Sequence, residues 1–422
     1  MTVLRLALQS LRNRWLTALL TVLAIAISVV LLLSVEKIRH GAKAGFANTV
    51  SDVDLIIGAR TGNIQLLLYS IFHIGNATNN ITWQSYQEVT SRRDIAWSVP
   101  ISLGDSHKGF RVIGTSRDFF KHYKFRKTQS VGFASGAAFD DLFDAVIGAE
   151  VAHKLGYTVG QKIVVAHGVG RLVTADHADM PFRVSGILAA TGTPIDRSVL
   201  MSLEAIEAIH INWRDGAPKQ GGFQVTAEMA RRLSARLKPK EITAAMIGLK
   251  SPISTFRVQR FVNTFEREPL TAAMPALTLY EMWGLVGTAE TALFAVSIMV
   301  VITSLIGMMA MILATLSERR REIAILRAMG AGPRTVIGLL LSEAGILAVV
   351  GVGVGLVTTY AGLAVVKPII NERYGLFLEM TAPTSVEWMV LGAVIFGGIL
   401  AGLIPAIRAY RMSLADGMTV RS

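Results

Sequence analysis

Histidine and aspartate residues gathered in one stretch of the chain are the side chains best suited to chemistry. All eight histidines lie between His40 and His210. Within that range, His167, His177 and Asp179 follow one another closely. Imidazole nitrogens and carboxylate oxygens are both ligands of Zn(II). A loop that brings these three residues together would form a zinc site. No standard spacing of metal ligands is matched, so ordinary solvated loop histidines are the alternative.

Other kinds of site find no support in the sequence. No arrangement of Ser, His and Asp or of paired carboxylates stands out, and the absence of Cys excludes disulfides and thiolate metal sites. The glycine-rich turn nearest to a nucleotide phosphate loop, Gly330 to Thr335, lacks the required lysine and does not follow a strand pattern. We therefore expect no catalytic site and no nucleotide phosphate loop in this sequence, and zinc is the one candidate cofactor.

A strongly charged turn and a short amphipathic helix are expected at residues 317–334, between two long apolar runs. Arg319, Arg320 and Arg321 lie directly after an apolar run, where positive charge marks the cytoplasmic side of a membrane. Apolar residues continue behind them along one side of the helix. A solvated helix end would explain the arginines but not this apolar stripe. The pattern predicts a helix that lies on the membrane surface or docks into a cytosolic partner.

Four apolar runs are long enough to span a bilayer, at residues 15–35, 285–316, 336–366 and 386–406. The arginines beside them place residues 1–14, 317–334 and 407–422 in the cytoplasm. Residues 1–14 carry leucines at helical spacing with arginines off that stripe, which predicts a basic amphipathic helix on the inner surface. A cleaved signal peptide is the alternative for the first run, although the run exceeds a normal signal core.

The third apolar run contains features that bear on helix packing. Gly351 to Gly355 has a spacing of small residues that permits close helix contact. Glu343 either makes a polar contact in the interior of a dimer or lies near the inner interface, where its carboxylate reaches the headgroups, and its position ten residues after Pro333 favours the headgroups. The pair Lys367-Pro368 is expected to end this helix, which leaves residues 367–385 as an outer loop.

The overall composition agrees with a membrane protein that has a sizeable soluble part. The chain has 422 residues, a mean hydropathy of +0.48 and a net charge of +12. Because the arginines cluster at the ends of apolar runs, membrane topology accounts for the basic charge and no nucleic-acid partner is expected.

Residues 36–283 are expected to form a large soluble domain across the membrane from the arginine-rich start. Long domains cross a membrane regardless of their charge. Alternating and β-branched runs predict strands at residues 53–57, 110–113, 162–165, 182–187 and 198–201. Helical patterns occur at residues 85–91, 203–210, 226–237 and 254–268. The domain is therefore expected to be mixed α and β.

The segment Glu318-Arg-Arg-Arg-Glu-Ile-Ala-Ile-Leu-Arg-Ala-Met-Gly-Ala331 resembles the signature of the FtsX-like permeases, the membrane subunits of MacB-like and LolC/LolE-like ABC transporters. Residues 405–417 are similar to the C-terminal ending of that family, and residues 4–33 resemble its lead-in and first span. In the family this segment is the cytoplasmic coupling helix that sits in a groove of the ATPase. The resemblance therefore assigns ATPase coupling to Glu318, Arg319, Arg320, Arg321, Glu322, Ile325, Leu326, Arg327 and Gly330.

The same resemblance implies a fold class: four transmembrane helices, with a large α/β periplasmic domain inserted between the first and second. That domain resembles the MacB-like periplasmic core domain and is expected to have two lobes. One lobe would combine residues 50–100 with 224–276, and the other would be inserted between them. MacB carries its ATPase on the same polypeptide, whereas this sequence has no phosphate loop and is closer to the LolC/LolE-like layout. The resemblance therefore implies that ATP and Mg²⁺ are bound by a separate ATPase chain.

The function implied is that of a permease subunit of a type VII ABC system, working by mechanotransmission in the bacterial inner membrane with both termini cytoplasmic. Its expected partners are a cytosolic ABC ATPase, a second permease subunit in a homo- or heterodimer, and a periplasmic adaptor, lipoprotein or binding protein. Its cargo would be a lipoprotein, lipid, peptide, drug or metal-linked molecule. Two alternatives are an FtsX-like regulator of a periplasmic hydrolase and a membrane sensor that reads a ligand with its outer lobes.

Overall fold

The computed structural model describes residues 2–49, 51–126, 128–168, 175–214, 217–218, 225–318, 320–374 and 382–411. The chain divides into two compact units. We call residues 1–41, 286–369 and 378–422 the helical unit, and residues 42–285 with 370–377 the α/β unit. Arg319 and the tail from residue 412 onward lie outside the described residues.

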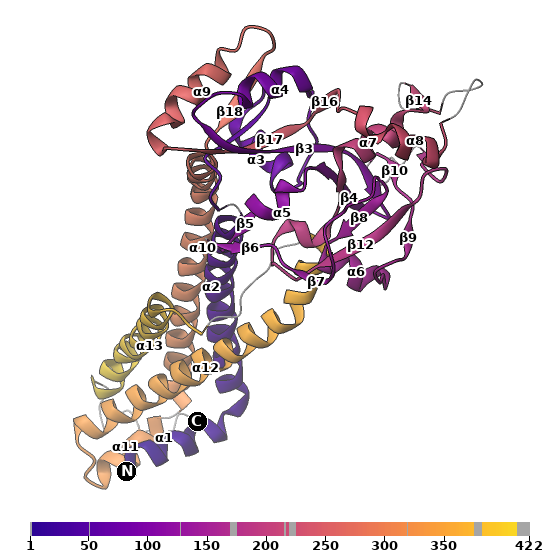
Figure 1. Ribbon diagram of the computed structural model, residues 1–422. Helices are drawn as coiled ribbons and strands as arrows, with labels where there is room; N and C mark the ends of the chain where they lie inside the picture. The colour runs from indigo at the N-terminus through magenta and orange to yellow at the C-terminus, as the bar shows by residue number, and fades with distance from the viewer. Residues whose placement is uncertain are drawn as a thin grey trace. The chain divides into compact units, whose positions relative to one another are not determined.

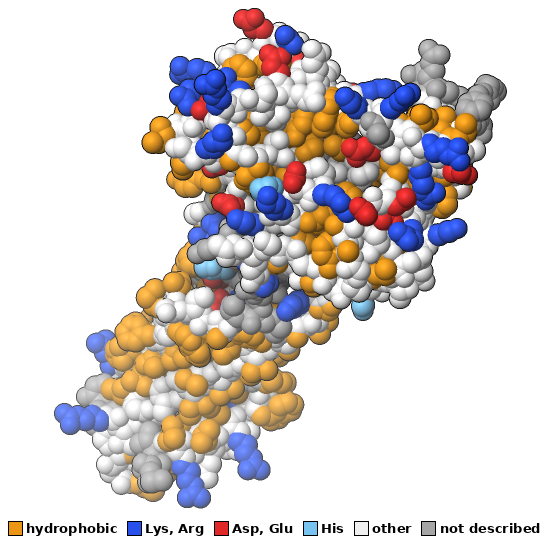
Figure 2. Space-filling model, in the orientation of Figure 1, with side chains coloured by type: hydrophobic (Ala, Val, Ile, Leu, Met, Phe, Trp, Pro, Cys, Tyr) orange, Lys and Arg blue, Asp and Glu red, His pale blue; other side chains and the backbone are white. Residues whose placement is uncertain are grey.

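The helical unit is built from long apolar helices (Figure 1). Its helices, three of which extend into the α/β unit, are α1 (Thr2–Asn13), α2 (Trp15–Thr49), α10 (Pro275–Glu318), α11 (Arg320–Ala328), α12 (Pro333–Tyr374) and α13 (Ser385–Arg411). Among the described residues, four of these helices (α2, α10, α12 and α13) are long and apolar enough to cross a membrane. Figure 2 shows hydrophobic side chains over much of this unit's visible surface, with Lys and Arg side chains at the end where α1 and α11 lie.

Glycines on α12 bring its backbone close to α2. A Cβ added at Gly351 would lie 2.7 Å from Ile25 Cγ2, and one added at Gly355 would lie 2.7 Å from Val29 Cβ. Gly353, on another side of α12, has open space around it. The predicted close helix contact at Gly351 and Gly355 is therefore confirmed, and α2 is the helix that they contact.

Two details of the third span differ from expectation. The helix α12 continues through Pro368 to Tyr374, because an internal proline removes one backbone donor without stopping a long apolar helix. The predicted outer loop therefore starts several residues later than Lys367. Glu343 is only 4% exposed and lines a small cavity with Arg14 and Thr17, so it lies inside the helix packing rather than at a lipid-facing position.

The α/β unit is organised by one large mixed sheet, with twelve strands among the described residues. Its pairings are mainly antiparallel, and β13/β4 and β12/β8 are parallel. In spatial order the main path is β18 (Leu270–Ala273), β1 (Leu55–Ala59), β17 (Ala244–Leu249), β3 (Ile95–His107), β4 (Phe110–Thr115), β13 (Ser198–Ser202), β8 (Asp144–Ile147), β12 (Phe182–Leu188) and β7 (Phe133–Gly136). Off this path, β9 (Lys162–Ile163) pairs with β12, while β10 (Ala166–His167) pairs with β3 and with β11 (Ala175–Asp176).

Alternate residues of the central strands enter cores on opposite faces of the sheet. On one face, a single core extends from Ile56 of β1 to Leu200 of β13 and beyond. On the other face there are two cores, one around Ile57 and the other around Val199 and Met201. The predicted two lobes thus correspond to the two cores on that face, with one correction: Ala230, predicted in the lobe of residues 224–276, packs in the core around Val199 instead. The lobes are not separate bodies, because one sheet and one opposite core run through both.

Seven helices among the described residues cover these cores. Three of them begin with a side-chain cap, in which Thr82, Ser202 or Thr226 accepts a hydrogen bond from the backbone N–H three residues later. The seven helices are α3 (Asn63–Ser70), α4 (Trp83–Thr90), α5 (Asp118–His122), α6 (Ala149–Leu155), α7 (Leu203–His210), α8 (Ala227–Leu233) and α9 (Thr255–Asn263). Three short strand pairs lie outside the large sheet: β2 (Ile81–Thr82) with β16 (Glu241–Ile242), β5 (Lys124–Phe125) with β6 (Gln129–Ser130), and β14 (Trp213–Arg214) with β15 (Ala217–Pro218). There are also 3₁₀ turns at Pro194–Arg197, Ser234–Arg236 and Pro252–Ser254.

Candidate functional site

A cluster of one aspartate and three histidines lies where β3, β10 and α7 meet in the α/β unit. Asp105 is on β3, directly opposite His167 of β10 in the antiparallel register. The pairing of β3 with β4 shifts between Leu103 and Ser106, and such bulges redirect side chains. His210 is the last residue of α7, and His177 follows β11. Four elements far apart in the sequence thus bring these residues together.

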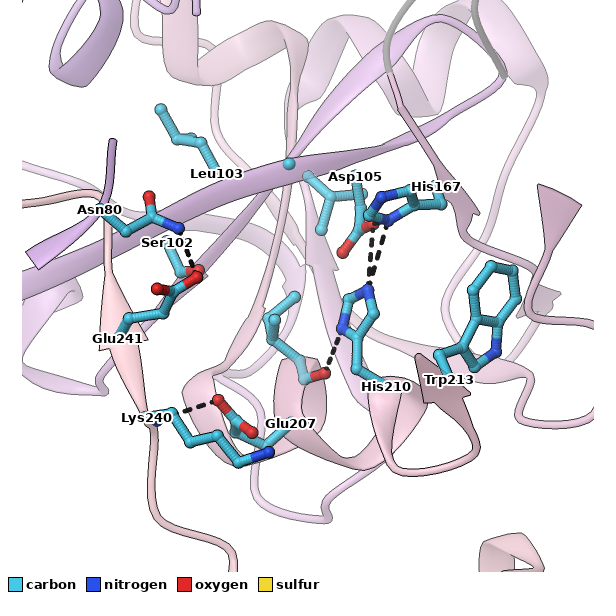
Figure 3. A pocket seen from close by; sticks show the side chains of 13 residues that line it. Asn80, Ser102, Leu103, Asp105, His167, Glu207, His210, Trp213, Lys240 and Glu241 are labelled. Carbon is cyan, nitrogen blue, oxygen red and sulfur yellow. Dashed lines mark hydrogen bonds and ion pairs between the residues drawn. The ribbon is translucent and has the colours of Figure 1, made fainter. Parts of the chain in front are cut away.

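Three of the four side chains make a compact triangle of potential ligand atoms. His167 Nδ1 lies 3.0 Å from Asp105 Oδ1, and His210 Nε2 lies 3.3 Å from His167 Nδ1 and 3.7 Å from Asp105 Oδ1. With His177 included, one ligand atom from each residue lies within 4.8 Å of every other. Figure 3 shows Asp105, His167 and His210 pointing toward one another.

His177 is the least satisfied member of the cluster. Its side chain is fully buried, and neither ring nitrogen has a hydrogen-bond partner among the described residues. Burial lowers the pKa of His177 to about 4, so the ring is neutral near pH 7. Its ring packs on Trp213 with 4.3 Å between the centroids and on His210 with 5.1 Å. A neutral, buried imidazole with both nitrogens unused calls for a partner.

The other histidines of the cluster are held by defined contacts. His210 Nδ1 lies 2.7 Å from the carbonyl oxygen of Ile206, which can only accept, so Nδ1 carries a proton and Nε2 is the nitrogen that faces the cluster; in the neutral ring, Nε2 has the lone pair. The hydrogen bond to Asp105 raises the pKa of His167. His107, two residues along β3 from Asp105, is different: both of its ring nitrogens are bonded, to the Val164 carbonyl and the Tyr157 hydroxyl.

A cavity of about 410 Å³ opens onto the cluster (Figure 3). Asp105, His167, His210 and Trp213 line one end of it. Polar groups line the other end, where Asn80 Nδ2 donates to Glu241 Oε1 at 2.6 Å. The cavity gives an ion or small molecule a route to the histidines.

The structure brings together two of the three predicted zinc ligands. His167 and His177 are in the cluster, whereas Asp179 is exposed and is not one of its four members. Asp105 and His210 complete the group instead. Asp179, the predicted carboxylate ligand, is therefore replaced by Asp105, which the pairing of β3 with β10 sets beside His167. Only the register of these two strands could have indicated Asp105.

The second candidate site is α11, within the predicted coupling segment. Ile323 is buried against the helical unit, whereas Ile325 is 51% exposed and Met329, one turn later, is 72% exposed. Leu326 and Arg327 are half-buried and Glu322 is exposed. The side chains of Glu318, Arg320 and Arg321 are not among those described. The exposed apolar pair is thus Ile325 and Met329 rather than Leu326.

Gly330 has a structural role that explains its place in the segment. Its φ is +94°, and its N–H donates to the carbonyl of Arg327 at 3.0 Å. The N–H of Ala331 donates to the carbonyl of Leu326 at 2.9 Å. These two bonds form a Schellman motif with glycine in the left-handed position, which ends α11.

Comparison with known proteins decides the family. The profile of the MacB-like periplasmic core domain matches residues 18–249, more than half of the chain. This chain belongs to the MacB-like permease family. The profile of the FtsX-like permease C-terminal region matches residues 294–414, which include α11. With its four apolar helices, this family member is a membrane protein, and the expected fold class is confirmed.

The chain is similar to individual known proteins over parts of their length. The chain is 24% identical over 418 residues to the macrolide export ATP-binding/permease protein MacB of Nitrobacter winogradskyi, covering 94% of this chain and 57% of that protein. It is 27% identical over 277 residues to an uncharacterized ABC transporter permease of Methanocaldococcus jannaschii, covering 63% of this chain and 60% of that one. A crystal structure of the periplasmic region of MacB from Actinobacillus actinomycetemcomitans aligns with a TM-score of 0.33 at 8% identity, over 56% of this chain and 94% of that one.

Proposed function

We propose that this MacB-like chain is the permease subunit of an ABC transporter and that α11 couples it to an ATPase on a separate cytosolic chain. The observation that carries this proposal is the exposed apolar pair Ile325 and Met329 on a short helix between two membrane-length helices. Met329 directly follows the last residue of α11, and its N–H donates to the Ile325 carbonyl at 3.0 Å, so the two side chains, four residues apart, lie on the same side. A few apolar side chains that enter a pocket supply most of the energy of an interface.

The way α11 is held supports docking over loose attachment to lipid. Ile323 joins the core of the helical unit, together with Leu316 and Val336 from the flanking helices. The Schellman motif at Gly330 fixes the other end of α11. A helix held at both sides presents Ile325 and Met329 in a fixed direction, which lowers the ordering cost of binding a partner.

Two long helices offer a physical means of mechanotransmission. The 44 residues of α10 extend about 66 Å at 1.5 Å per residue, roughly twice the hydrocarbon thickness of a bilayer. Within the helical unit, α2 and α10 are joined at both ends of their contact. Arg14 Nη1 donates to the Thr315 carbonyl at 3.2 Å, and Arg39 Nε donates to Glu290 Oε2 at 3.0 Å. A pair joined in this way would carry a displacement at α11 along its whole length.

The proposal includes a location and a direction. The basic end of the helical unit, with α1 and α11, would face the cytoplasm, and the α/β unit would lie outside the inner membrane. Two of these subunits would assemble with two ATPases. Relatives are named for the export of macrolides and of pyoverdine, which favours export of a small molecule over handling of lipoproteins.

Copurification tests the proposal. The full chain, purified from its native membrane, should carry a separate ABC ATPase, identified by mass spectrometry, together with ATPase activity. Ile325→Glu places a carboxylate in the proposed contact and should lose both, because burying an unpaired charge costs several kcal/mol. Ile325→Met keeps the apolar contact and should retain both.

Two results would count against the proposal. A wild-type preparation that contains no ATPase chain would contradict the proposed partner. An Ile325→Glu chain that inserts normally and keeps its ATPase at the wild-type level would show that α11 is not the coupling element.

A further inference from the structure

We propose that Asp105, His167, His177 and His210 bind a divalent first-row transition metal ion, for which Zn(II) is the best match. The proposal stands on the geometry of the α/β unit and does not depend on the proposed transport function. It assigns the cluster a ligand, and it replaces Asp179 of the sequence-based zinc prediction with Asp105 and His210.

The spacing of the ligand atoms fits a tetrahedral ion. With metal–ligand bonds of about 2.0–2.1 Å, neighbouring ligand atoms on a tetrahedron are separated by about 3.3 Å. The three distances among Asp105 Oδ1, His167 Nδ1 and His210 Nε2 are 3.0, 3.3 and 3.7 Å. These three atoms therefore already form one face of a zinc-sized tetrahedron. His177 is the candidate for the fourth vertex, because its ligand atom lies within 4.8 Å of those of the other three residues and a small side-chain movement would bring it to the ion.

The hydrogen bonds around the cluster suit metal ligation. The Ile206 carbonyl holds the proton of His210 on Nδ1, which leaves Nε2 free to bind a metal. Metal-ligating histidines commonly donate their other N–H to a carbonyl in this way. Three imidazoles and one carboxylate favour Zn(II), Co(II), Ni(II) or Cu(II) over Ca²⁺ and Mg²⁺, which prefer oxygen ligands.

A metal-free ion pair is the competing explanation, and it accounts for only part of the cluster. A charged His167 beside Asp105 would balance the buried carboxylate. It would leave His177 fully buried with two unsatisfied ring nitrogens. A metal ion would bind Asp105 and one ring nitrogen of His177 together, so it accounts for one of these nitrogens, which the ion pair does not.

The cavity provides an entrance for the ion. The side chains of His167 and His210 are 35% and 29% exposed, whereas Asp105 is 3% exposed. An ion arriving through the cavity would meet the two imidazoles first. Binding would then join β3, β10, the residue after β11 and the end of α7, so metal should stabilise this part of the α/β unit.

Metal titration of the full-length chain tests the proposal. The protein, purified in detergent without a histidine tag and stripped with a chelator, is titrated with ZnCl₂ by calorimetry. We expect one Zn(II) per chain at high affinity. His177→Ala should weaken binding by at least about 100-fold, since even the loss of a group that only orients a ligand costs 10–100-fold. Asp179→Ala and His153→Ala, at two exposed positions, should bind as the wild type does.

Two further measurements keep the test decisive if His177→Ala folds poorly. In the wild-type chain, saturating Zn(II) should raise the unfolding temperature, because a ligand that binds only the folded state stabilises it. Co(II) in place of Zn(II) should give the visible absorption of a tetrahedral site with nitrogen and oxygen ligands. The proposal is overturned if the wild-type chain binds no Zn(II), or if Asp179→Ala loses binding while His177→Ala keeps it.

Discussion

Two alanine substitutions on α12, two residues apart, should have opposite effects on stability. At Gly355, the new Cβ would lie 2.7 Å from Val29 Cβ and 2.9 Å from the Ala26 carbonyl oxygen. An ordinary contact begins near 3.4 Å, so α12 would have to move away from α2 by about 0.7 Å. At Gly353, no heavy atom lies within 4 Å of the new Cβ.

The expected magnitudes follow from these contacts. Overpacking a tight contact costs about 1–3 kcal/mol, while replacing a helical glycine by alanine gains up to about 1 kcal/mol. Gly355→Ala should therefore lose about 1–2 kcal/mol, and Gly353→Ala should gain up to about 1 kcal/mol. The unfolding temperatures of both variants, measured by tryptophan fluorescence in one detergent at one scan rate, should shift in opposite directions. Equal shifts, or a more stable Gly355→Ala variant, would refute the proposed packing of α2 against α12.

Two other predictions concern the helical unit. Lys37 and Glu387 form a buried ion pair with 3.1 Å between Nζ and Oε2. Lys37→Met should destabilise the chain by about 3 kcal/mol or more in thermal unfolding, because it leaves the Glu387 carboxylate buried and unpaired. Adding Glu387→Gln should recover much of the loss, because Gln removes that charge and still accepts the hydrogen bond from the Thr384 N–H that caps α13. The proposed topology predicts that an impermeant thiol reagent labels Ser91→Cys but not Thr335→Cys in intact spheroplasts. Both positions are exposed, and the chain has no native cysteine. The reverse labelling would contradict the proposed orientation.

The parts of the fold that depend on local hydropathy could be predicted from the sequence. Membrane-length helices can be recognised in the sequence as long apolar runs. The spacing of Gly351 and Gly355 indicates a close helix contact, although it does not show which helix is the partner. The exposed side of α11 was harder to predict. Ile323, Ile325 and Leu326 are all apolar, and only their packing against the flanking helices shows that Ile325 faces outward.

The sheet shows why the remainder could not be predicted. Pro100 suggests the end of a segment, and a proline within a strand argues against a central position. In the structure it lies in the middle of β3, opposite Ala245, and its carbonyl accepts a hydrogen bond from Thr115 Oγ1 at 2.8 Å. With β3 undetected, the register that sets Asp105 opposite His167 was also out of reach. The candidate metal site depends on that long-range pairing.

The order of strands in the sheet also has a consequence for biogenesis. Leu55 of β1 pairs with Ile247 of β17, and Ile56 pairs with Ala273 of β18, so both neighbours of β1 are synthesised long after it. A sheet dominated by such distant pairings forms slowly, because the closing of large loops must precede the contacts that stabilise them. Both edges of β1 are unpaired until residue 249 has emerged, and one edge stays unpaired until residue 273. Its side chains, Leu-Ile-Ile-Gly-Ala, are all buried in the folded chain. Nascent chains of this protein should therefore need protection from aggregation over most of the synthesis of the α/β unit, and truncations that remove β17 and β18 should be degraded rather than accumulate as a folded N-terminal fragment.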